Sequence, residues 1–363
     1  MSLWVVVGGQ YGSEGKGKIS AFITKQQKID ICVRCGGPNS GHSFIDEHGR
    51  TIILRQLPTG YVRSKTRLLI PAGALIDVDV LKSEIAALQI PPERIGIDPN
   101  CFVIEARDLD TERALRLQER FSSTLCGVGA ALSRRVLRDD AGKLVKDVAD
   151  YHPWLRNLVV KEGVSAELNA ALDDGKGALI EGTQGFGLSL YHSPHYPHCT
   201  SRDTTAAGFL SEVGVSPLRV TEIVVVFRTF PIRVAGLQAG PLNAEIDWDT
   251  VRRESGYPHE IEERTSVTNK IRRVARFDWE LARRAVQING PTLLAINGLD
   301  YLNAKNRGVH QMSELTPGAV EFVQRLEDNT GVSCGFLGTG PSLGDMVLRQ
   351  NVRSRPDFAA LRA

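Results

Sequence analysis

Short apolar stretches recur along the chain, and most of them run directly into glycine, asparagine or proline. They are continuous rather than alternating, and they are rich in β-branched residues. Strands buried on both faces of a parallel sheet have this pattern, whereas half-exposed strands alternate apolar and polar positions. We therefore predict mostly parallel strands at residues 3–7, 29–33, 51–54, 67–70, 178–180, 223–227 and 292–296.

Helical patterns lie between these strands. Residues 78–88 have apolar positions at helical spacing and stop before a Pro-Pro pair, and residues 108–121 and 279–288 have amphipathic helical patterns. The alternation of strands and helices predicts an α/β fold with a mostly parallel central sheet. No repeat, low-complexity tract or linker interrupts it, so we expect residues 1–363 to form a single large domain.

Composition excludes several classes of protein. The apolar fraction of 42% supports a large core, and the net charge of +2 gives no general case for a nucleic-acid partner. We expect no membrane span, because no apolar run reaches the roughly 18 residues that one needs. We also see no secretion leader at the N-terminus. Six cysteines in so long a chain do not suggest a disulfide framework, so we expect a cytoplasmic protein.

The first glycine-rich loop follows the first strand and carries two lysines. Its residues are Gly12, Ser13, Glu14, Gly15, Lys16, Gly17 and Lys18. Glycines let backbone N–H groups approach phosphate oxygens, and lysines neutralise their charge. The spacing fits a P-loop, but Ile19 stands where Ser or Thr would hold Mg²⁺. Any metal must therefore be held elsewhere, which argues against an ordinary P-loop NTPase.

A second glycine-rich loop, residues 34–43, follows the second strand and contains His42. Two such loops at strand ends converge where open α/β sheets bind their ligands. Imidazole suits proton transfer and charge stabilisation near neutral pH, so His42 is a candidate catalytic or phosphate-contacting residue. The alternative is a loop histidine bonded to backbone.

Two groups of residues suggest metal sites only weakly. His192, His195, His198 and Cys199 are closely spaced, but Pro194 and Pro197 break any helix that could align them. A loop lining a ligand pocket is the favoured interpretation. Cys32 and Cys35 form a lone C-x2-C without a second pair, so we interpret them as two small residues at a strand end. The glycines of residues 181–187 have the wrong spacing for a dinucleotide fingerprint.

Hydroxyl and basic clusters indicate anionic ligands. Residues 122–124 and 200–201 could hold a phosphate monoester, or could be helix caps and turns. Guanidinium groups bind carboxylates bidentately, so a basic cluster near residue 270 could clamp a dicarboxylate. The alternatives are a solvated helix face and a nucleic-acid patch, and the latter lacks interleaved aromatic residues. The cluster consists of Lys270, Arg272, Arg273 and Arg276.

Taken together, these segments resemble the adenylosuccinate synthetase family along nearly the whole chain. The family's opening motif G-x-x-G-D-E-G-K-G-K matches residues 9–18, with Ser13 in place of the aspartate. Further matches are G-G-x-N-A-G-H-T at 36–43, L-P-S-G at 57–60, E-G-A-Q-G at 181–185, Y-P-x-V-T-S at 196–201 and S-T-G-P at 338–341.

The resemblance implies a ligase. In that family a nucleoside triphosphate phosphorylates the 6-oxygen of IMP, and the amino group of L-aspartate then displaces the phosphate. An aspartate of the opening motif removes the N1 proton and binds Mg²⁺, and the histidine of the second loop stabilises the 6-oxyanion. By match, the catalytic residues are Ser13, His42 and Gln184, and the metal ligands are Ser13 and the Gly41 carbonyl.

The resemblance also implies binding residues. Ser13, Asn39, Thr124, Gln184 and Thr200 would hold the purine nucleotide, and Arg134 would reach the nucleotide phosphate on the neighbouring subunit of a homodimer. Thr268, Lys270 and Arg272 would bind aspartate. The triphosphate would contact Glu14, Gly15, Lys16, Gly17, Lys18, Gly41, His42, Ser43, Asn297, Asp300, Gly338 and Gly340.

Departures from the family motifs point to a changed substrate. Ser13 replaces a carboxylate with a shorter neutral group beside N1 and C2 of the purine, where a 2-amino group would sit. This pattern resembles the phage-type enzymes that make N6-succino-2-amino-2′-deoxyadenylate, a precursor of 2-aminoadenine in DNA, from dGMP and aspartate. The family's T-T-G-R loop is Val267-Thr268-Asn269-Lys270 in this chain. Lys270 thus replaces the arginine of the loop, a change that a deoxyribose substrate would permit. Its guanine-reading K-x-D reads Gly298-Leu299-Asp300, which favours ATP or dATP over GTP.

Three alternatives remain open at this point. An ordinary adenylosuccinate synthetase that tolerates serine would use IMP and GTP. A catalytically inactive regulator would bind nucleotide without releasing phosphate. A P-loop NTPase acting on nucleic acid is disfavoured by Ile19 and by the near-neutral charge. The group that deprotonates N1 is open among an activated Ser13, a metal-bound water and His42 in a double role.

Overall fold

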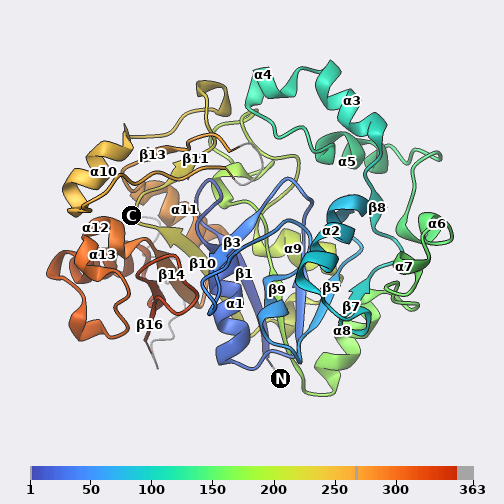
Figure 1. Cartoon of the computed structure of the whole chain (residues 1–363), viewed down its shortest axis with the longest axis horizontal. Coiled ribbons are helices and arrows are strands. Elements are labelled where there is room, and N and C mark those ends of the chain that lie inside the picture. The colour runs from blue at the N-terminus through green and yellow to red at the C-terminus, as the bar shows by residue number, and fades with distance from the viewer. Residues whose placement is uncertain (1, 266–268, 350–363) are drawn as a thin grey trace.

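A nine-stranded sheet runs through the computed structural model, which describes residues 2–265 and 269–349 (Figure 1). All neighbouring strands are parallel except the last pair, β15 and β16. In spatial order the strands are β16 (Met346–Leu348), β15 (Cys334–Gly338), β14 (Leu293–Asn297), β10 (Glu222–Arg228), β1 (Ser2–Gly8), β9 (Gly177–Glu181), β2 (Ile31–Arg34), β5 (Arg67–Ile70) and β7 (Ile95–Ile97).

Helices cover both faces of this sheet, and the alternation of side chains along β1 shows why. Leu3, Val5 and Val7 belong to one apolar core, whereas Trp4 and Val6 belong to the other. The first core is closed by α8 (Val164–Asp173), α9 (Ala206–Val213), α11 (Trp279–Asn289) and α13 (Pro317–Thr330), and the second by α1 (Lys16–Gln26) and α2 (Val78–Leu88). Because both cores lie against the same sheet, we keep the prediction of a single domain.

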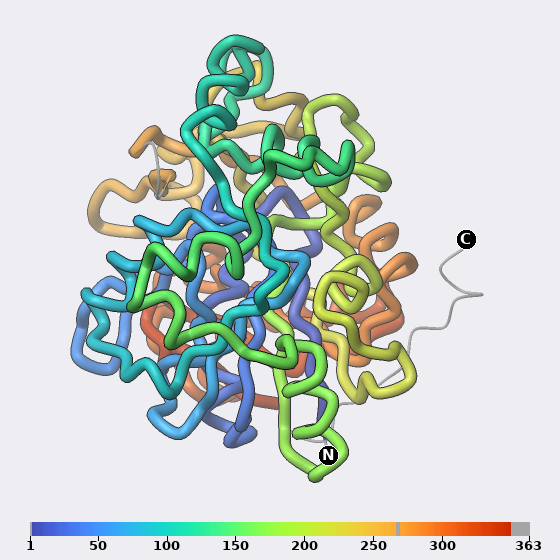
Figure 2. The backbone as a smooth tube through the Cα atoms, turned by 90° about the vertical axis from the view of Figure 1, so that its right-hand side faces the viewer, coloured from blue at the N-terminus to red at the C-terminus, as the bar shows by residue number. Residues whose placement is uncertain are grey.

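Smaller elements surround the ends of the strands. On one side are α3 (Ala106–Ala114), α4 (Leu117–Phe121), α5 (Val128–Val136), β6 (Leu75–Ile76) and β8 (Phe102–Val103), followed by α6 (Val145–Ala149) and α7 (Pro153–Arg156). On the other are a small sheet of β11 (Ile232–Arg233), β13 (Arg273–Ala275) and β12 (Glu245–Ile246), with α10 (Trp248–Ser255) and α12 (Leu299–Leu302). Figure 2 shows from the side that the α3–α4 segment stands above the sheet.

The predicted fold class is confirmed, and two of the predicted elements are wrong. Residues 51–54 form a strand, but β4 (Thr51–Leu54) pairs with β3 (His42–Ile45) in a separate antiparallel hairpin, where alternate side chains are exposed. Residues 108–121 form two helices rather than one, because Arg116 adopts a left-handed conformation with φ of 53° between α3 and α4. Strands 67–70 and helix 78–88 lie where they were predicted.

Packing against the sheet makes the central strands sensitive to truncation. Leu179 on β9 is fully buried between the sheet and its cover, so Leu179→Ala is expected to lower the free energy of unfolding by about 2–5 kcal/mol. The matched control is Leu218→Ala at a leucine that is 95% exposed, which is expected to change it by less than about 0.5 kcal/mol. Urea unfolding measures both, and equal effects would contradict the assignment of the core.

Candidate active site

One large pocket of about 840 Å³ lies at the carboxyl end of the parallel strands. Its lining comes from the segments that follow β1, β2, β9, β10, β14 and β15. It is closed on one side by α4 and on the other by residues of 257–265 together with Lys270 and Arg272. Most of the described residues of the sequence-predicted site therefore converge on one cavity. The same cavity receives the hydroxyl residues Ser122, Ser123, Thr124, Thr200 and Ser201.

The first glycine-rich loop is shaped by the side chain of Glu14. This carboxylate is fully buried and accepts hydrogen bonds from the backbone N–H of Gln10 at 3.0 Å and of Gly12 at 2.9 Å. It also pairs with Lys16 Nζ at 2.6 Å. Glu14 is one of the predicted triphosphate contacts and lines the pocket, while its side chain is bonded to the loop. Ser13 next to it lines the pocket with a left-handed φ of 56°.

Two glycines allow the loop to pack closely against its neighbours. Gly15 has a φ of 87°, and a Cβ there would lie 2.6 Å from Asn297 Nδ2, which donates to the Glu14 carbonyl. A Cβ on Gly17 would lie 2.6 Å from His42 Cβ. The loop then begins α1 at Lys16 with no side-chain cap. Its free N–H groups and positive dipole end favour a phosphate at this position.

Lys18 is held beneath the loop rather than at the protein surface. Its Nζ donates to the carbonyls of Gly340 and Asp345, each at 2.7 Å. Burial lowers the pKa of Lys18 to about 8, an effect that Asp345 and Asp300 partly oppose. Near neutral pH the ammonium therefore carries its charge, and a modest rise in pH removes it.

His42, the first residue of β3, is 5% exposed and lies between a carboxylate and the pocket. Its Nδ1 is hydrogen-bonded to Glu181, and its Nε2 is buried without a hydrogen-bond partner in the described part of the chain. Burial, followed by the charge of Arg34, lowers the pKa of His42 to about 4, although Glu181 opposes both effects. The imidazole is therefore neutral near pH 7 in the absence of ligands.

The predicted nucleotide-binding residues separate into two groups. Asn39, Thr124, Gln184 and Thr200 all line the pocket. Arg134 does not line the pocket of its own chain. Its guanidinium pairs with Asp108 at 2.7 Å, Glu105 at 3.0 Å and Asp139 at 3.2 Å.

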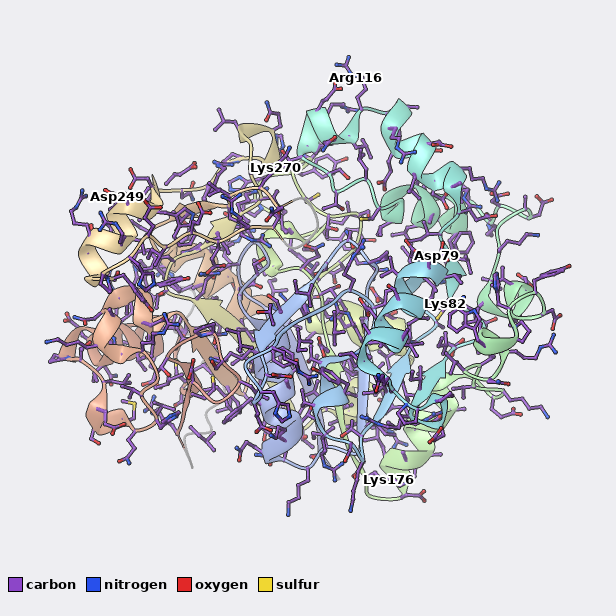
Figure 3. The ribbon with its side chains drawn as sticks, in the orientation of Figure 1. Asp79, Lys82, Arg116, Lys176, Asp249 and Lys270 are labelled. Atoms are coloured by element: carbon purple, nitrogen blue, oxygen red, sulfur yellow. The ribbon has the colours of Figure 1, made fainter. Side chains whose placement is uncertain are left out.

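The four cations of the basic cluster near residue 270 do not all line the pocket. Lys270 and Arg272 line the pocket, whereas Arg273 pairs with Glu245 and Arg276 pairs with Glu254 outside it. The predicted clamp of four cations is therefore reduced to two. Figure 3 shows Lys270 between the α10 side, where Asp249 is labelled, and the α4 side, where Arg116 is labelled. Thr268 lies outside the described residues.

The remaining predicted triphosphate contacts are mostly present in the same cavity. Gly41, Ser43, Asn297, Asp300 and Gly340 line it, as do Gly15, Lys16, Gly17, Lys18 and His42. Gly338 does not, because it is the last residue of β15 and lies packed against Asn297. Asp300 is 5% exposed and accepts a hydrogen bond from Tyr257 Oη at 2.7 Å. Burial raises the pKa of its carboxyl group, and the Tyr257 bond opposes that rise.

Sequence reasoning missed two buried arginines, Arg228 at the end of β10 and Arg233 at the end of β11. Arg228 pairs with Glu263, and its Nη1 also donates to the Ser13 carbonyl at 3.0 Å. Arg233 lies 4.7 Å above the Tyr11 ring and has no carboxylate within ion-pair distance among the described residues. Burial lowers its pKa to about 10. The position of Arg228 directly after the apolar run 223–227 was a signal that could have found it, and Arg233 had no such signal.

The histidine-rich loop provides pocket lining rather than a cation cage. His198 and Cys199 line the cavity, whereas His195 lies beside Tyr11 Oη at 3.3 Å. Within residues 2–265 and 269–349, no group of three or more His, Cys, Asp or Glu side chains is arranged to hold a metal ion. Mg²⁺ usually keeps several waters and is bound through one or two protein oxygens plus substrate phosphates. The Ser13 hydroxyl and the Gly41 carbonyl, both at the pocket, fit that donor set.

No helix in the described ranges is long and apolar enough to cross a membrane.

The buried neutral state of His42 predicts a dependence of stability on pH. The unfolded histidine takes up its proton near pH 6.5 and the folded one only near pH 4, so the unfolded state binds more protons between these values. The free energy of unfolding should fall as pH decreases from 6.5 to 4, by at most about 1.4 kcal/mol per unit from this group. His42→Asn should flatten this slope in urea titrations, whereas His48→Asn at an exposed histidine should not. Equal slopes in both variants would contradict the buried neutral imidazole.

The comparisons with known proteins agree with one another. The sequence model of the family described as adenylosuccinate synthetase matches residues 5–152 and 139–307. The chain is 40% identical over 356 residues to the adenylosuccinate synthetase of Thermococcus onnurineus, covering 97% of this chain and 99% of the relative. It is 39% identical over 351 residues to that of Methanocaldococcus jannaschii, covering 96% of both.

Two solved structures share the fold. The fully ligated adenylosuccinate synthetase of Plasmodium falciparum matches with a TM-score of 0.85 at 19% identity, covering 96% of this chain and 100% of the other. The succinoaminodeoxyadenylate synthetase (PurZ) of cyanophage S-2L, described as bound to dGMP and to dATP as an energy donor, matches with a TM-score of 0.79 at 25% identity. The coverage is 96% of this chain and 95% of the phage protein.

The match extends over most of the sequence and the whole described fold. The central sheet and the loops at its carboxyl edge are those of an adenylosuccinate synthetase-like α/β fold. The chain belongs to the adenylosuccinate synthetase family and is a carbon–nitrogen ligase that joins aspartate to a purine nucleotide.

Proposed function

We propose that this ligase joins L-aspartate to C6 of dGMP, using ATP or dATP, and so makes N6-succino-2-amino-2′-deoxyadenylate. The observation that carries the proposal is Ser13 in the nucleotide pocket, at the position of the family's aspartate. The neighbouring carboxylates of Glu14 and Glu263 are already paired with Lys16 and Arg228. A purine 2-amino group next to Ser13 would therefore meet a short neutral hydroxyl that can accept its hydrogen bond.

The reaction would proceed in two balanced steps. The 6-oxygen of the purine attacks the γ-phosphorus of the triphosphate as N1 gives its proton to a base, for which His42 is a candidate, and the nucleoside diphosphate leaves. The neutral amino group of aspartate then attacks C6, inorganic phosphate leaves, and the new C6–N group releases a proton to solvent. Backbone N–H groups of residues 15–17 with Lys16 and Lys18 would hold the triphosphate, and His42 would stabilise charge on the 6-oxygen. Bound Mg²⁺, held at Ser13 and the Gly41 carbonyl, would supply neutralisation of phosphate charge.

The substrate ends would be held from opposite sides of the pocket. Asn39, Thr124, Gln184 and Thr200 would bind the purine monophosphate, and Lys270 and Arg272, together with Thr268, would bind the aspartate carboxylates. We include a homodimer in the proposal, with Arg134 exchanging its own acidic partners for the nucleotide phosphate across the interface. Val136 and Leu137, 71% and 75% exposed at the end of the same helix, offer an apolar surface for that contact. A cytoplasmic location agrees with six free cysteines.

The donor preference rests on the segment after β14. Gly298 stands where the family has lysine, and Asp300 already accepts a hydrogen bond from Tyr257. A guanine would need that carboxylate for its N1–H and 2-amino donors, so an adenine donor is favoured. The phage structure described as holding dATP supports the same preference.

The ordinary reaction with IMP and GTP is the second candidate. The curated relatives at 36–40% identity are all named adenylosuccinate synthetase, and they favour this alternative more directly than they favour dGMP. An inactive nucleotide-binding regulator is a third candidate from another class, and it predicts binding without phosphate release.

Aspartate-dependent phosphate release tests the three candidates together. With Mg²⁺, aspartate and either dATP or GTP as donor, the wild type is expected to release phosphate with dGMP and dATP. It should release at least about tenfold less with IMP and either donor, a difference of about 1.4 kcal/mol in transition-state binding. Ser13→Asp should reverse this preference, because a carboxylate crowds the 2-amino side. Ser13→Ala should weaken it, because the hydroxyl that accepts the hydrogen bond of the 2-amino group is lost. Release with IMP alone would reject the dGMP proposal, and binding without any release would reject catalysis.

Lys18 predicts how donor binding depends on pH. Its pKa of about 8 means that the free enzyme loses this positive charge as pH rises above 8, so donor affinity falls. The Kd for dATP, measured by calorimetry from pH 7 to 9.5, should rise by up to about tenfold per unit above pH 8. Lys18→Met should bind more weakly at pH 7 and show no such rise. A rise that persists in Lys18→Met would assign it to another group.

A further inference from the structure

We infer that Glu181 is a positioning residue for His42: its carboxylate holds the proton of the imidazole on Nδ1 and leaves Nε2 as the atom that meets the reacting groups. The inference deepens the proposed function and rests on it for the role of His42. It assigns a role to Glu181 in the 181–185 segment. This residue does not itself line the pocket.

The carboxylate of Glu181 is completely buried at the last position of β9 and is held by four donors. One oxygen, Oε1, accepts from Arg34 Nη1 at 3.0 Å and is bonded to His42 Nδ1. The other, Oε2, accepts from the backbone N–H of Thr59 at 2.8 Å and from its Oγ1 at 2.7 Å. A carboxylate with this many fixed donors has little freedom to rotate or to shift.

Arg34 is itself anchored, so the support extends beyond the Glu181–His42 pair. Arg34 is 2% exposed, and its Nη2 donates to the carbonyls of Ser40 at 2.7 Å and Leu54 at 3.2 Å. These carbonyls belong to the loop before β3 and to β4, the two sides of the hairpin that begins with His42. One guanidinium therefore fixes both the carboxylate and the segment that carries the histidine.

The donors around Glu181 decide the tautomer of His42. Interactions with His42, Arg34 and Thr59 hold the pKa of Glu181 below its usual value, against the effect of burial, so the group is an ionised acceptor. The atom facing it, Nδ1, must then be the donor. In a neutral imidazole the other nitrogen, Nε2, carries the lone pair. This atom is buried in a pocket-lining residue and has no hydrogen-bond partner among the described residues.

This arrangement gives Nε2 a definite chemical capacity. It can accept a proton from a reacting group, and the imidazolium that results is stabilised by the carboxylate behind it. The charged groups that face His42 from neighbouring elements are Arg34 on β2, Lys16 on α1 and Glu181 on β9. Two of these three are cations, and Glu181 is the anion that is hydrogen-bonded to the imidazole. Because Ser13 carries no carboxylate, the lone pair on Nε2 is also a candidate acceptor for the N1 proton.

Glu181→Gln would keep the size of the side chain but remove the ionised acceptor that fixes the tautomer of His42. The amide nitrogen must face either Thr59 N–H or the Arg34 and His42 side, where it meets donors. In the second orientation it favours an imidazole that accepts at Nδ1 and carries its proton on Nε2. We expect kcat to fall by about a hundredfold or more, since a wrong tautomer is known to cost enzymes at least this much. The KM for the purine nucleotide should stay within a few-fold.

The matched control is Thr59→Val, which removes one hydrogen bond to the same carboxylate without touching its contact with His42. It should lower stability and leave kcat within about threefold of the wild type, well short of the effect of removing a catalytic orienting group. Glu181→Asp keeps the charge on a shorter side chain and should recover part of the activity lost in the glutamine variant. Equal losses of kcat in Glu181→Gln and Thr59→Val would reduce Glu181 to a structural residue and overturn the inference.

Nitrogen-15 NMR of histidine-labelled enzyme tests the tautomer without substrate, with the His42 signals identified by their loss in His42→Asn. The wild type is expected to show a protonated Nδ1 and an unprotonated Nε2 at pH 7, and Thr59→Val should show the same. A wild-type proton on Nε2 would overturn the inference even if the glutamine variant does not fold. Since this measurement requires no turnover, it can succeed where the dGMP proposal fails, and it can fail where that proposal succeeds.

Discussion

The parallel arrangement of the strands is the constraint on which the site depends. In a parallel sheet every strand ends at the same edge, so the segments that follow β1, β2, β9, β10, β14 and β15 must meet there. Residues separated by more than 300 positions thus become neighbours, as Lys18 and Gly340 do. This edge also leaves strand-terminal backbone groups unpaired by the sheet. Glycine-rich loops and helix starts use those groups to surround phosphate.

Phosphate-binding cations that gather at a buried edge repel one another, and three carboxylates offset this repulsion. Glu14 neutralises Lys16 and shapes the first loop, Glu181 neutralises Arg34 and holds His42, and Glu263 neutralises Arg228. Each carboxylate accepts from more than one donor, which compensates for its loss of hydration. The cations are thereby fixed before any ligand arrives. A preorganised site of this kind stabilises developing charge without reorganising during the reaction.

Sequence patterns predicted the sheet because continuous apolar runs report burial on both faces, and they placed the glycine loops because those loops follow the runs. They failed where long-range pairing decides the outcome. Arg273 and Arg276 have the same local composition as Lys270 and Arg272, but acidic partners on β12 and α10 draw them away from the pocket. Residues 51–54 are apolar like the core strands, yet the turn at 46–50 pairs them with β3 instead. No local pattern could report that Glu14 folds back onto its own loop.

The substrate is decided by far fewer atoms than the fold. The two solved structures share the fold of this chain, so the same framework can hold different purines. Serine has two fewer side-chain heavy atoms than aspartate and carries no charge. This one change lies at the pocket beside paired carboxylates. The site lacks the aspartate that the family uses as a base, but it keeps a histidine that is held by a carboxylate. That histidine is another candidate proton acceptor. For the reaction proposed above, the buried Glu181–His42 pair would be the part of the framework that makes the loss of the aspartate chemically tolerable.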